Sequence, residues 1–313
     1  MIINQILEEA IKKLSNKKIL SAHLDAEILL SHIIKKPREY LLAHPEKKLT
    51  QKQVSSFKFQ VSRRLKGEPV AYITGHKEFY GLDFFVDKNV LIPRQETELM
   101  VDEIMEQGTR NKEQGTIIDI GTGSGCIIIT LAKNLNSKFK IQNSKFFATD
   151  ISKPVLAIAR KNAKLHNVHK DIKFFQGDLL KPIINNFSKF PGRAPRSGAG
   201  KIQNSKLIIT ANLPYLTPAQ IKNSPSIKYE PKLALSAGAD GLKYYRKLFK
   251  QIKNVSCSMF RVPCFVLCEI DPSQTTKIKQ LINKELLSSQ IQIKKDLRGL
   301  NRMVICSINL RQD

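Results

Sequence analysis

The residues best suited to chemistry follow a short apolar stretch, Leu207 to Ala211. These residues are Asn212, Leu213, Pro214 and Tyr215. The Asn side-chain oxygen and the carbonyl of the next residue can each accept one N–H of a planar amide or aminopurine group. Proline fixes the direction of the turn, and an aromatic ring can cover the planar group. The same residues could also form an ordinary turn at the end of a strand.

A planar nitrogen of this kind is a poor nucleophile because its lone pair is delocalised. It therefore needs orientation along the axis of attack, and two acceptors for its hydrogens, more than it needs a strong base. No strong base is required because the methylated nitrogen becomes acidic and loses a proton readily. Methylation of an amide or aminopurine nitrogen is the chemistry that this pattern indicates.

A glycine-rich turn lies earlier in the chain, after a β-rich stretch that ends at Ile120. Its residues are Gly121, Thr122, Gly123, Ser124 and Gly125. Glycines allow a tight turn and leave room for a ligand at the N-terminus of the helix that follows. A nicotinamide-binding turn would be spelled G-x-G-x-x-G, whereas position 126 is Cys.

Acidic residues end or follow the next two predicted strands. Asp150 is placed to accept hydrogen bonds from ribose hydroxyls, and Asp178 with Leu179 could hold an adenine ring. Because parallel strands end at one edge of a sheet, these residues and Asn212 should share a pocket there. Asn212 favours S-adenosylmethionine over a dinucleotide as the cofactor.

The supporting elements alternate between strands and helices from Gly115 onward, which indicates a parallel sheet with helices on both faces. We predict an α/β fold with a Rossmann-like class I methyltransferase sheet, doubly wound and mostly parallel. Two strand-like segments, Gln290 to Leu297 and Arg302 to Ile308, could pair antiparallel at its edge.

Three regions are expected along the chain. Helical spacing of apolar residues predicts four or five short helices in a small domain over 1–66. β-forming residues, among them Tyr72 and Ile73, predict a β-hairpin connector over 67–98. The methyltransferase domain would then cover 99–313, with a mobile Gly- and Pro-rich insertion at 185–206.

The composition is that of a globular protein: 42% of the 313 residues are apolar, and no run is long enough to span a membrane. The N-terminal residues lack the features of a secretory signal, which predicts a cytoplasmic location. Cys264 and Cys268 lack the paired spacing of a zinc site, so no metal is expected.

The net charge of +25 could attract nucleic acid or an acidic protein. Lysine supplies most of this excess and is spread along the chain, as biased composition would also produce. Charge alone therefore does not identify the partner.

The chain resembles the release-factor glutamine methyltransferase family, the HemK/PrmC-type enzymes, over nearly its whole length. The resemblance extends from the helical N-terminal domain to the turn at 212–215. Its most specific parts are the connector run Gly67 to Gly75 and the run Pro93-Arg94-Gln95-Glu96-Thr97-Glu98. One departure is Leu213, where the family usually has Pro and where RNA adenine dimethyltransferases have the spelling Asn-Leu-Pro-Tyr.

The resemblance implies a substrate and a set of site residues. The substrate would be the glutamine of the Gly-Gly-Gln loop of peptide chain release factors, methylated on its side-chain nitrogen and gripped through the N-terminal domain of a monomeric enzyme. The cofactor would bind at 121–125, Asp150, Asp178, Leu179 and Asn212, and the glutamine at 212–215. Two alternatives stay open: an adenine methyltransferase acting on RNA or DNA, and a non-catalytic scaffold that holds a release factor.

Overall fold

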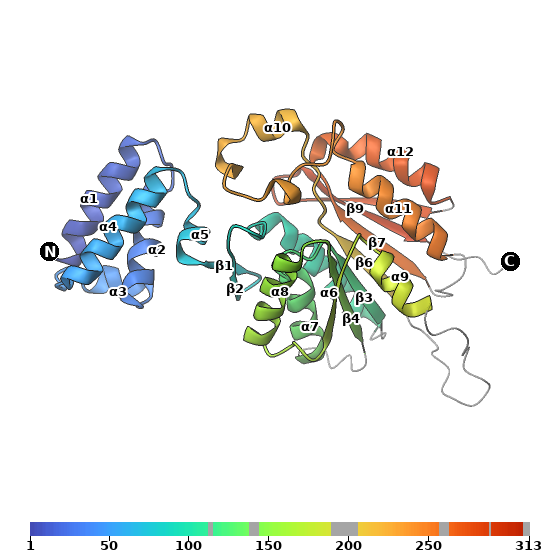
Figure 1. Cartoon of the computed structure of the whole chain (residues 1–313), viewed down its shortest axis with the longest axis horizontal. Coiled ribbons are helices and arrows are strands. Elements are labelled where there is room, and N and C mark those ends of the chain that lie inside the picture. Colours follow the sequence, from blue (N-terminus) through green and yellow to red (C-terminus); the bar gives the residue numbers. More distant parts are fainter. Residues whose placement is uncertain (112–114, 138–143, 189–205, 257–262, 288, 309–313) are drawn as a thin grey trace. The chain divides into compact units, whose positions relative to one another are not determined.

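The structure, a computed structural model, describes residues 1–111, 115–137, 144–188, 206–256, 263–287 and 289–308. The chain divides into two compact units (Figure 1). One unit comprises Met1–His76, Val86–Lys88 and Ser226–Tyr229, and the other comprises Lys77–Phe85, Asn89–Pro225 and Glu230–Asp313. In the part of the chain that is described, no helix has the length and apolar character needed to cross a bilayer.

The first unit is helical, as the apolar spacing predicts. Its helices are α1 (Ile3–Asn16), α2 (Ala22–Ile34), α3 (Arg38–Ala43), α4 (Gln51–Leu65) and α5 (Val70–Thr74). Residues from all five helices share one core, in which Leu14, Leu29 and Leu30 are fully buried. The short helix α5 corrects one expectation, because it contains Tyr72 and Ile73, two of the β-forming residues assigned to the connector. Pro69 precedes this helix with φ −60°, Ile73 is buried, and Gly75 ends it in the left-handed conformation.

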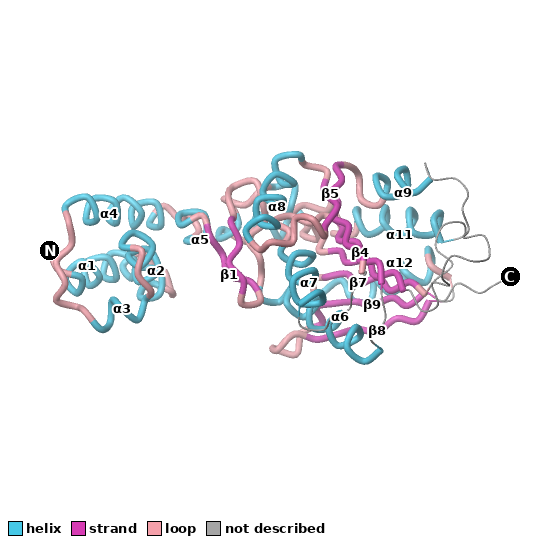
Figure 2. Tube along the Cα trace, turned by 90° about the horizontal axis from the view of Figure 1, so that it is seen from below, coloured by secondary structure: helices cyan, strands magenta, loops and turns pink. Residues whose placement is uncertain are grey.

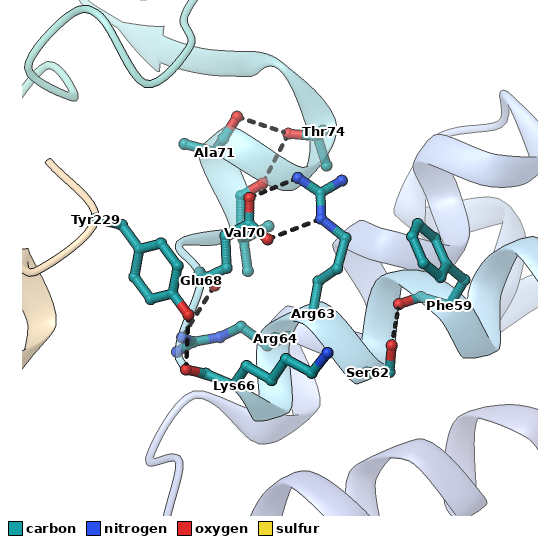
Figure 3. Close-up of polar contacts among 10 residues, drawn as sticks. All are labelled: Phe59, Ser62, Arg63, Arg64, Lys66, Glu68, Val70, Ala71, Thr74 and Tyr229. Atoms are coloured by element: carbon teal, nitrogen blue, oxygen red, sulfur yellow. Dashed lines mark hydrogen bonds and ion pairs between the residues drawn. The ribbon is translucent and has the colours of Figure 1, made fainter.

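Polar contacts order the chain around the end of α4 (Figure 3). The Arg63 guanidinium donates to both carboxylate oxygens of Glu68, with Nε 2.7 Å from Oε2. The Tyr229 hydroxyl donates to the carbonyl of Lys66 at 2.9 Å. Residues 226–229, distant in sequence, thus belong to the helical unit.

A hairpin follows, as predicted for the connector. Its strands are β1 (His76–Phe79) and β2 (Leu82–Phe85). Tyr80 and Gly81 form the turn with φ +54° and +72°, which matches the handedness that a two-residue hairpin turn requires. The backbone N–H of Tyr80 donates to Glu98 at 2.8 Å, which links the turn to the helix that starts there.

The second unit contains a seven-stranded sheet with the order β5-β4-β3-β6-β7-β9-β8. Its strands are β3 (Gly115–Ile120), β4 (Lys145–Asp150), β5 (Ile172–Gln176), β6 (Lys206–Ala211), β7 (Cys264–Glu269), β8 (Ser289–Lys295) and β9 (Asn301–Ile308). The first five strands in this order are parallel, and β9 is antiparallel to both β7 and β8. The predicted fold class, including the antiparallel edge, is confirmed.

Helices cover both faces of the sheet (Figures 1 and 2). The longer helices are α6 (Glu98–Asn111), α7 (Cys126–Ser137), α8 (Lys153–Leu165), α11 (Lys243–Ser256) and α12 (Thr275–Glu285). The shorter ones are α9 (Lys181–Ser188), α10 (Pro218–Lys222), η1 (Gln95–Thr97), η2 (Pro225–Ile227), η3 (Lys232–Ala234) and η4 (Pro272–Gln274). Two apolar clusters follow from strand alternation: Ile117 and Ile208 pack with α6 and α7, whereas Ile118 and Ile209 pack with α11 and α12.

The expected insertion at 185–206 falls mostly outside the described residues. Residues 185–188 belong to α9, and residue 206 begins β6. Residues 189–205, which include the Gly- and Pro-rich run, lie outside the described ranges.

The buried side chain of Asn162 joins β2 to the glycine-rich turn. Its Nδ2 donates to the carbonyls of Phe85 and Ser124 at 3.0 and 2.8 Å, and its Oδ1 accepts from the N–H of Phe85 at 2.8 Å. The side chain is 0% exposed, so water does not replace these bonds.

Asn162→Ala should therefore lower the free energy of unfolding by about 3 kcal/mol, because one buried and two partly buried backbone groups lose a hydrogen bond. Chemical denaturation of both proteins measures the difference. Asn186→Ala, at an exposed position on α9, is the matched control and should change stability by less than about 0.5 kcal/mol. Equal effects of the two substitutions would contradict this role of Asn162.

Candidate active site

The sheet register brings the predicted site residues to one edge. Ile120 pairs with Thr149 on β4 and with Ala211 on β6, so Gly121, Asp150 and Asn212 follow on adjacent strands. Ala211 pairs in turn with Cys268, which places Asn212 beside Glu269. The carboxyl edge of the parallel strands is therefore the candidate active site.

The glycine-rich turn leaves β3 in a conformation that favours glycine. Gly121 has φ +71°, and its N–H and that of Thr122 both donate to the carbonyl of Thr149 at 2.9 Å. A Cβ atom at Gly121 would lie 2.9 Å from Cδ2 of Leu213. A side chain at position 121 would therefore displace the Leu213 side chain, and it would be strained at this positive φ angle.

Asp119 lies buried beneath this turn. Its Oδ2 accepts from the Thr122 hydroxyl at 2.6 Å, and its Oδ1 accepts from the Thr210 hydroxyl at 2.8 Å. Burial raises the pKa of Asp119 to about 6, and the two hydroxyls only partly offset that effect. Asp119 connects the glycine-rich turn to β6, the strand that directly precedes Asn212.

Asp150 is positioned at the same edge by backbone donors. Its Oδ2 accepts from the N–H of Gly123 at 3.2 Å and its Oδ1 from the N–H of Ser152 at 2.9 Å. Burial raises the pKa of Asp150, whereas these backbone bonds lower it. Each oxygen retains acceptor capacity, so the carboxylate suits a pair of vicinal hydroxyls.

Asp178 and Leu179 lie after β5. The Asp178 carboxylate is 2.7 Å from Nζ of Lys247. Leu179 has φ +53° and is 8% exposed, with its side chain in the apolar cluster beneath α11. A non-glycine residue in this conformation is uncommon and is found at functional sites more often than elsewhere. Their contact with an adenine ring stays a prediction.

The side-chain amide of Asn212 is anchored by hydrogen bonds that its nitrogen donates. Nδ2 donates to Oγ1 of Thr97 at 3.1 Å and to Oε2 of Glu269 at 2.9 Å. Both of these acceptors lie on the nitrogen side of the amide. The amide oxygen Oδ1 is therefore the end that can accept a hydrogen from a ligand.

The three residues after Asn212 are also fixed. The Tyr215 hydroxyl donates to Oε1 of Glu269 at 3.1 Å, and the Tyr215 carbonyl accepts from Nε2 of Gln274 at 2.7 Å. Burial and the Glu269 charge raise the pKa of Tyr215 well above its ordinary value. Leu213 is buried in the core at 3% exposure, and Pro214 is half-buried between these two anchored residues.

Sequence reasoning missed Thr97 and Glu269 as members of this site. Thr97 lies in the Pro-Arg-Gln-Glu-Thr-Glu run, and its hydroxyl donates to Glu269 at 2.6 Å. Arg94 in the same run is paired with Glu230, whose side chain is 2% exposed. The available signal for Glu269 was an acidic residue at the end of the apolar strand β7, in the same position that Asp150 has on β4.

A metal centre is not expected at this site from the sequence. Within the ranges that the structure describes, no three His, Cys, Asp or Glu residues are grouped so that they could hold a metal ion.

The fold and the strand-end site define a Rossmann-like methyltransferase. A family model described as "Methyltransferase domain" matches residues 111–226, and one described as "PrmC N-terminal domain" matches residues 5–75. The release factor glutamine methyltransferase of Chlorobaculum tepidum is 32% identical over 308 residues, covering 96% of each chain. That of Bacillus subtilis is 34% identical over 288 residues, covering 90% of each. The chain therefore belongs to the release factor glutamine methyltransferase family and is an enzyme.

Two further comparisons describe the fold and the domain context. A "Bifunctional methyltransferase" of Rickettsia bellii is 33% identical over 337 residues, which covers 98% of this chain but 55% of that protein. The human METTL16 catalytic domain, solved in complex with a MAT2A 3'UTR hairpin, superposes with a TM-score of 0.51 at 14% identity and covers 91% of this chain and 92% of its own. At this identity the likeness concerns the fold alone.

The buried Asp119 predicts a pH dependence of stability. Because its pKa is about 6 in the folded protein, above its ordinary value of 3.8, the stability that it contributes is fully present below pH 4 and is lost as the pH rises through 6. Asp119→Asn cannot ionise, and its free energy of unfolding relative to wild type should rise by about 2 kcal/mol between pH 4 and pH 8. Thermal unfolding across this range measures the difference, with exposed Asp171→Asn as the control. A pH-independent difference for Asp119→Asn would refute the assignment.

Proposed function

We propose that this enzyme transfers a methyl group from S-adenosylmethionine to the side-chain amide nitrogen, N5, of the glutamine in the Gly-Gly-Gln motif of peptide chain release factors. The observation that carries this proposal is the Asn212 amide, whose nitrogen donates toward Thr97 and Glu269 so that its oxygen can receive a substrate N–H. The relatives named as release factor glutamine methyltransferases, which match this chain over nearly its full length, support the substrate.

The residues at the carboxyl edge fit the cofactor. The positive φ angles of Gly121, Gly123 and Gly125 hold the turn open, and the Asp150 carboxylate has spare acceptor capacity for ribose hydroxyls. We assign binding of the adenine ring of S-adenosylmethionine to Asp178 and Leu179. When bound, S-adenosylmethionine supplies a methyl group on a sulfonium sulfur, which is activated toward a weak nucleophile.

The substrate nitrogen is oriented by acceptors at the end of β6. Asn212 Oδ1 and the Leu213 carbonyl each accept one N–H, which aligns the lone pair with the methyl group. Pro214 fixes the turn, and Tyr215 covers the planar amide. A nitrogen–carbon bond forms as the carbon–sulfur bond breaks, the bonding electrons stay on sulfur, and the nitrogen then releases one proton to water.

The Leu213 departure is compatible with this proposal. Its backbone carbonyl is retained, and its side chain packs toward Gly121, where a Cβ atom would lie 2.9 Å from Leu213 Cδ2. Leucine loses the fixed φ angle that proline would supply, but burial of its side chain restricts the turn instead. We assign recognition of the release factor, which acts on ribosomes in the cytoplasm, to the helical residues 1–66 of a monomeric enzyme.

Asn212→Ala should lower kcat for release-factor methylation by about 100-fold, because an acceptor aligned with the reacting nitrogen is lost. Labelled S-adenosylmethionine is incubated with a release factor, its Gly-Gly-Gln to Gly-Gly-Ala variant, and total RNA. Label is expected in the intact release factor alone. Asn223→Ala, at an exposed position after α10, is the matched control and should retain wild-type activity.

Each other outcome of this assay has a definite meaning. Label in RNA but not in the release factor would identify an adenine methyltransferase and refute the proposed substrate. Label in the Gly-Gly-Ala variant would refute the assignment of the glutamine. A release factor bound tightly by wild type and by Asn212→Ala, with label in neither, would identify a non-catalytic scaffold.

Asp150→Ala should weaken binding of S-adenosylmethionine by about 10- to 100-fold, because hydrogen bonds between a ligand and a charged group each contribute about 1.5–3 kcal/mol. Titration calorimetry with the cofactor alone measures this change without a release factor. Asp171→Ala is the matched exposed control. An unchanged dissociation constant for Asp150→Ala would remove Asp150 from the cofactor site.

A further inference from the structure

The Glu269 carboxylate is buried at the end of β7, with 3% of the residue exposed. Its Oε2 accepts from the Thr97 hydroxyl at 2.6 Å and from Asn212 Nδ2 at 2.9 Å. Its Oε1 accepts from the Tyr215 hydroxyl at 3.1 Å. All three donors point toward the carboxylate and favour its ionised form, but burial is the larger effect and leaves the pKa of Glu269 raised.

The direction of the Asn212 amide follows from these contacts. Thr97 donates its hydroxyl hydrogen to Glu269 and uses an oxygen lone pair to accept from Asn212. A reversed amide would place Asn212 Oδ1 against the Glu269 carboxylate and leave two acceptors facing each other. The closed triangle of Thr97, Asn212 and Glu269 therefore permits one orientation of the amide.

We infer that Glu269 is a positioning residue for methyl transfer, which fixes the Asn212 amide and polarises it so that Oδ1 becomes a stronger acceptor for the substrate N–H. The inference rests on the proposed function, because it takes Asn212 as the residue that accepts the N–H of the reacting substrate nitrogen. Glu269 itself does not contact the substrate and acts through Asn212.

Electrostatics give this arrangement its effect on rate. The substrate nitrogen becomes positive as its bond to the methyl carbon forms, and a negative charge held nearby in a buried site stabilises that change without reorganisation. A carboxylate bonded to Nδ2 pushes electron density toward Oδ1, because hydrogen bonds in a chain polarise one another. The substrate then loses its proton to water, and Glu269 need not accept it.

The charge state of Glu269 depends on its neighbours. Burial raises its pKa, whereas the bonds from Thr97 and Tyr215 and the positive charge of Arg302 lower it. The titratable and charged groups that face it are Tyr215 after β6, Glu96 in η1, Arg302 in β9, Tyr245 in α11 and Cys126 in α7. Protonation of Glu269 as the pH falls removes the charge that polarises Asn212, so kcat should decline on the acid side.

The test compares Glu269→Gln with Glu285→Gln, a control at another buried glutamate on α12. Glu269→Gln should lower kcat for release-factor methylation by about 10- to 100-fold and remove the acid-side decline of kcat. The KM for the release factor and the dissociation constant of S-adenosylmethionine should change by less than about threefold, because neither ligand contacts Glu269. Glu285→Gln should keep the wild-type kcat and its pH profile.

A second measurement needs no activity. In protein labelled with ¹⁵N-asparagine, the side-chain NH₂ signals of Asn212 are identified by their loss in Asn212→Ala. They should shift in Glu269→Gln and as Glu269 titrates in wild type, but not in Glu285→Gln. This readout also shows whether Glu269→Gln retains the folded site.

The two measurements separate failure of the inference from failure of the proposed function. The inference would be overturned if Glu269→Gln kept the wild-type kcat and pH profile, or if the NH₂ signals of Asn212 did not change in Glu269→Gln. Release-factor methylation would still stand. If wild type methylates RNA and not the release factor, the proposed substrate fails. The same kcat comparison, made on RNA, then decides whether Glu269 acts through Asn212.

Discussion

The Glu269 carboxylate is buried where β7 ends, and the geometry around Asn212 follows from how that burial is compensated. An unpartnered buried carboxylate is costly, so each oxygen needs donors. Here the donors come from η1, from the end of β6 and from the turn after it. Satisfying one buried charge therefore orders three separate segments at once. The Pro-Arg-Gln-Glu-Thr-Glu run matters in this scheme because it carries Thr97 to the carboxylate, while Arg94 of the same run is paired with Glu230.

The glycine-rich turn and the turn at 212–215 are joined through the same strand ends. Asp119 reaches the glycine-rich turn through Thr122 and reaches β6 through Thr210. On the other side of the turn, Leu213 occupies the space that a side chain at Gly121 would need. A displacement of the glycine-rich turn would therefore also displace Asn212, even when no ligand is bound. Buried polar bonds through Asp119 thus fix the glycine-rich turn relative to the strand that precedes Asn212.

The fold and half of the site could be predicted because they depend on local patterns. Alternating apolar strands and amphipathic helices define the sheet, and its parallel strands must end at one edge, so Gly121, Asp150 and Asn212 can be grouped from the order of the residues alone. Thr97 and Glu269 cannot be grouped in this way. The hydrogen bond between them joins positions 172 residues apart, and no periodic pattern in the sequence indicates it. The helix α5 was missed for the opposite reason: a run of β-forming residues is overridden by Pro69 before it and by the helical core that buries Ile73.

The strand order has a consequence for synthesis of the chain. β9 (Asn301–Ile308) lies between β7 and β8, so β7 acquires its second neighbour only after residues 301–308 have been made. Until then a nascent chain exposes an apolar strand edge, and such edges pair with other chains. Chaperone capture or aggregation of stalled chains would act at this stage, before the Glu269 carboxylate is enclosed. The ribosome must therefore complete almost the whole sheet before the candidate active site can form.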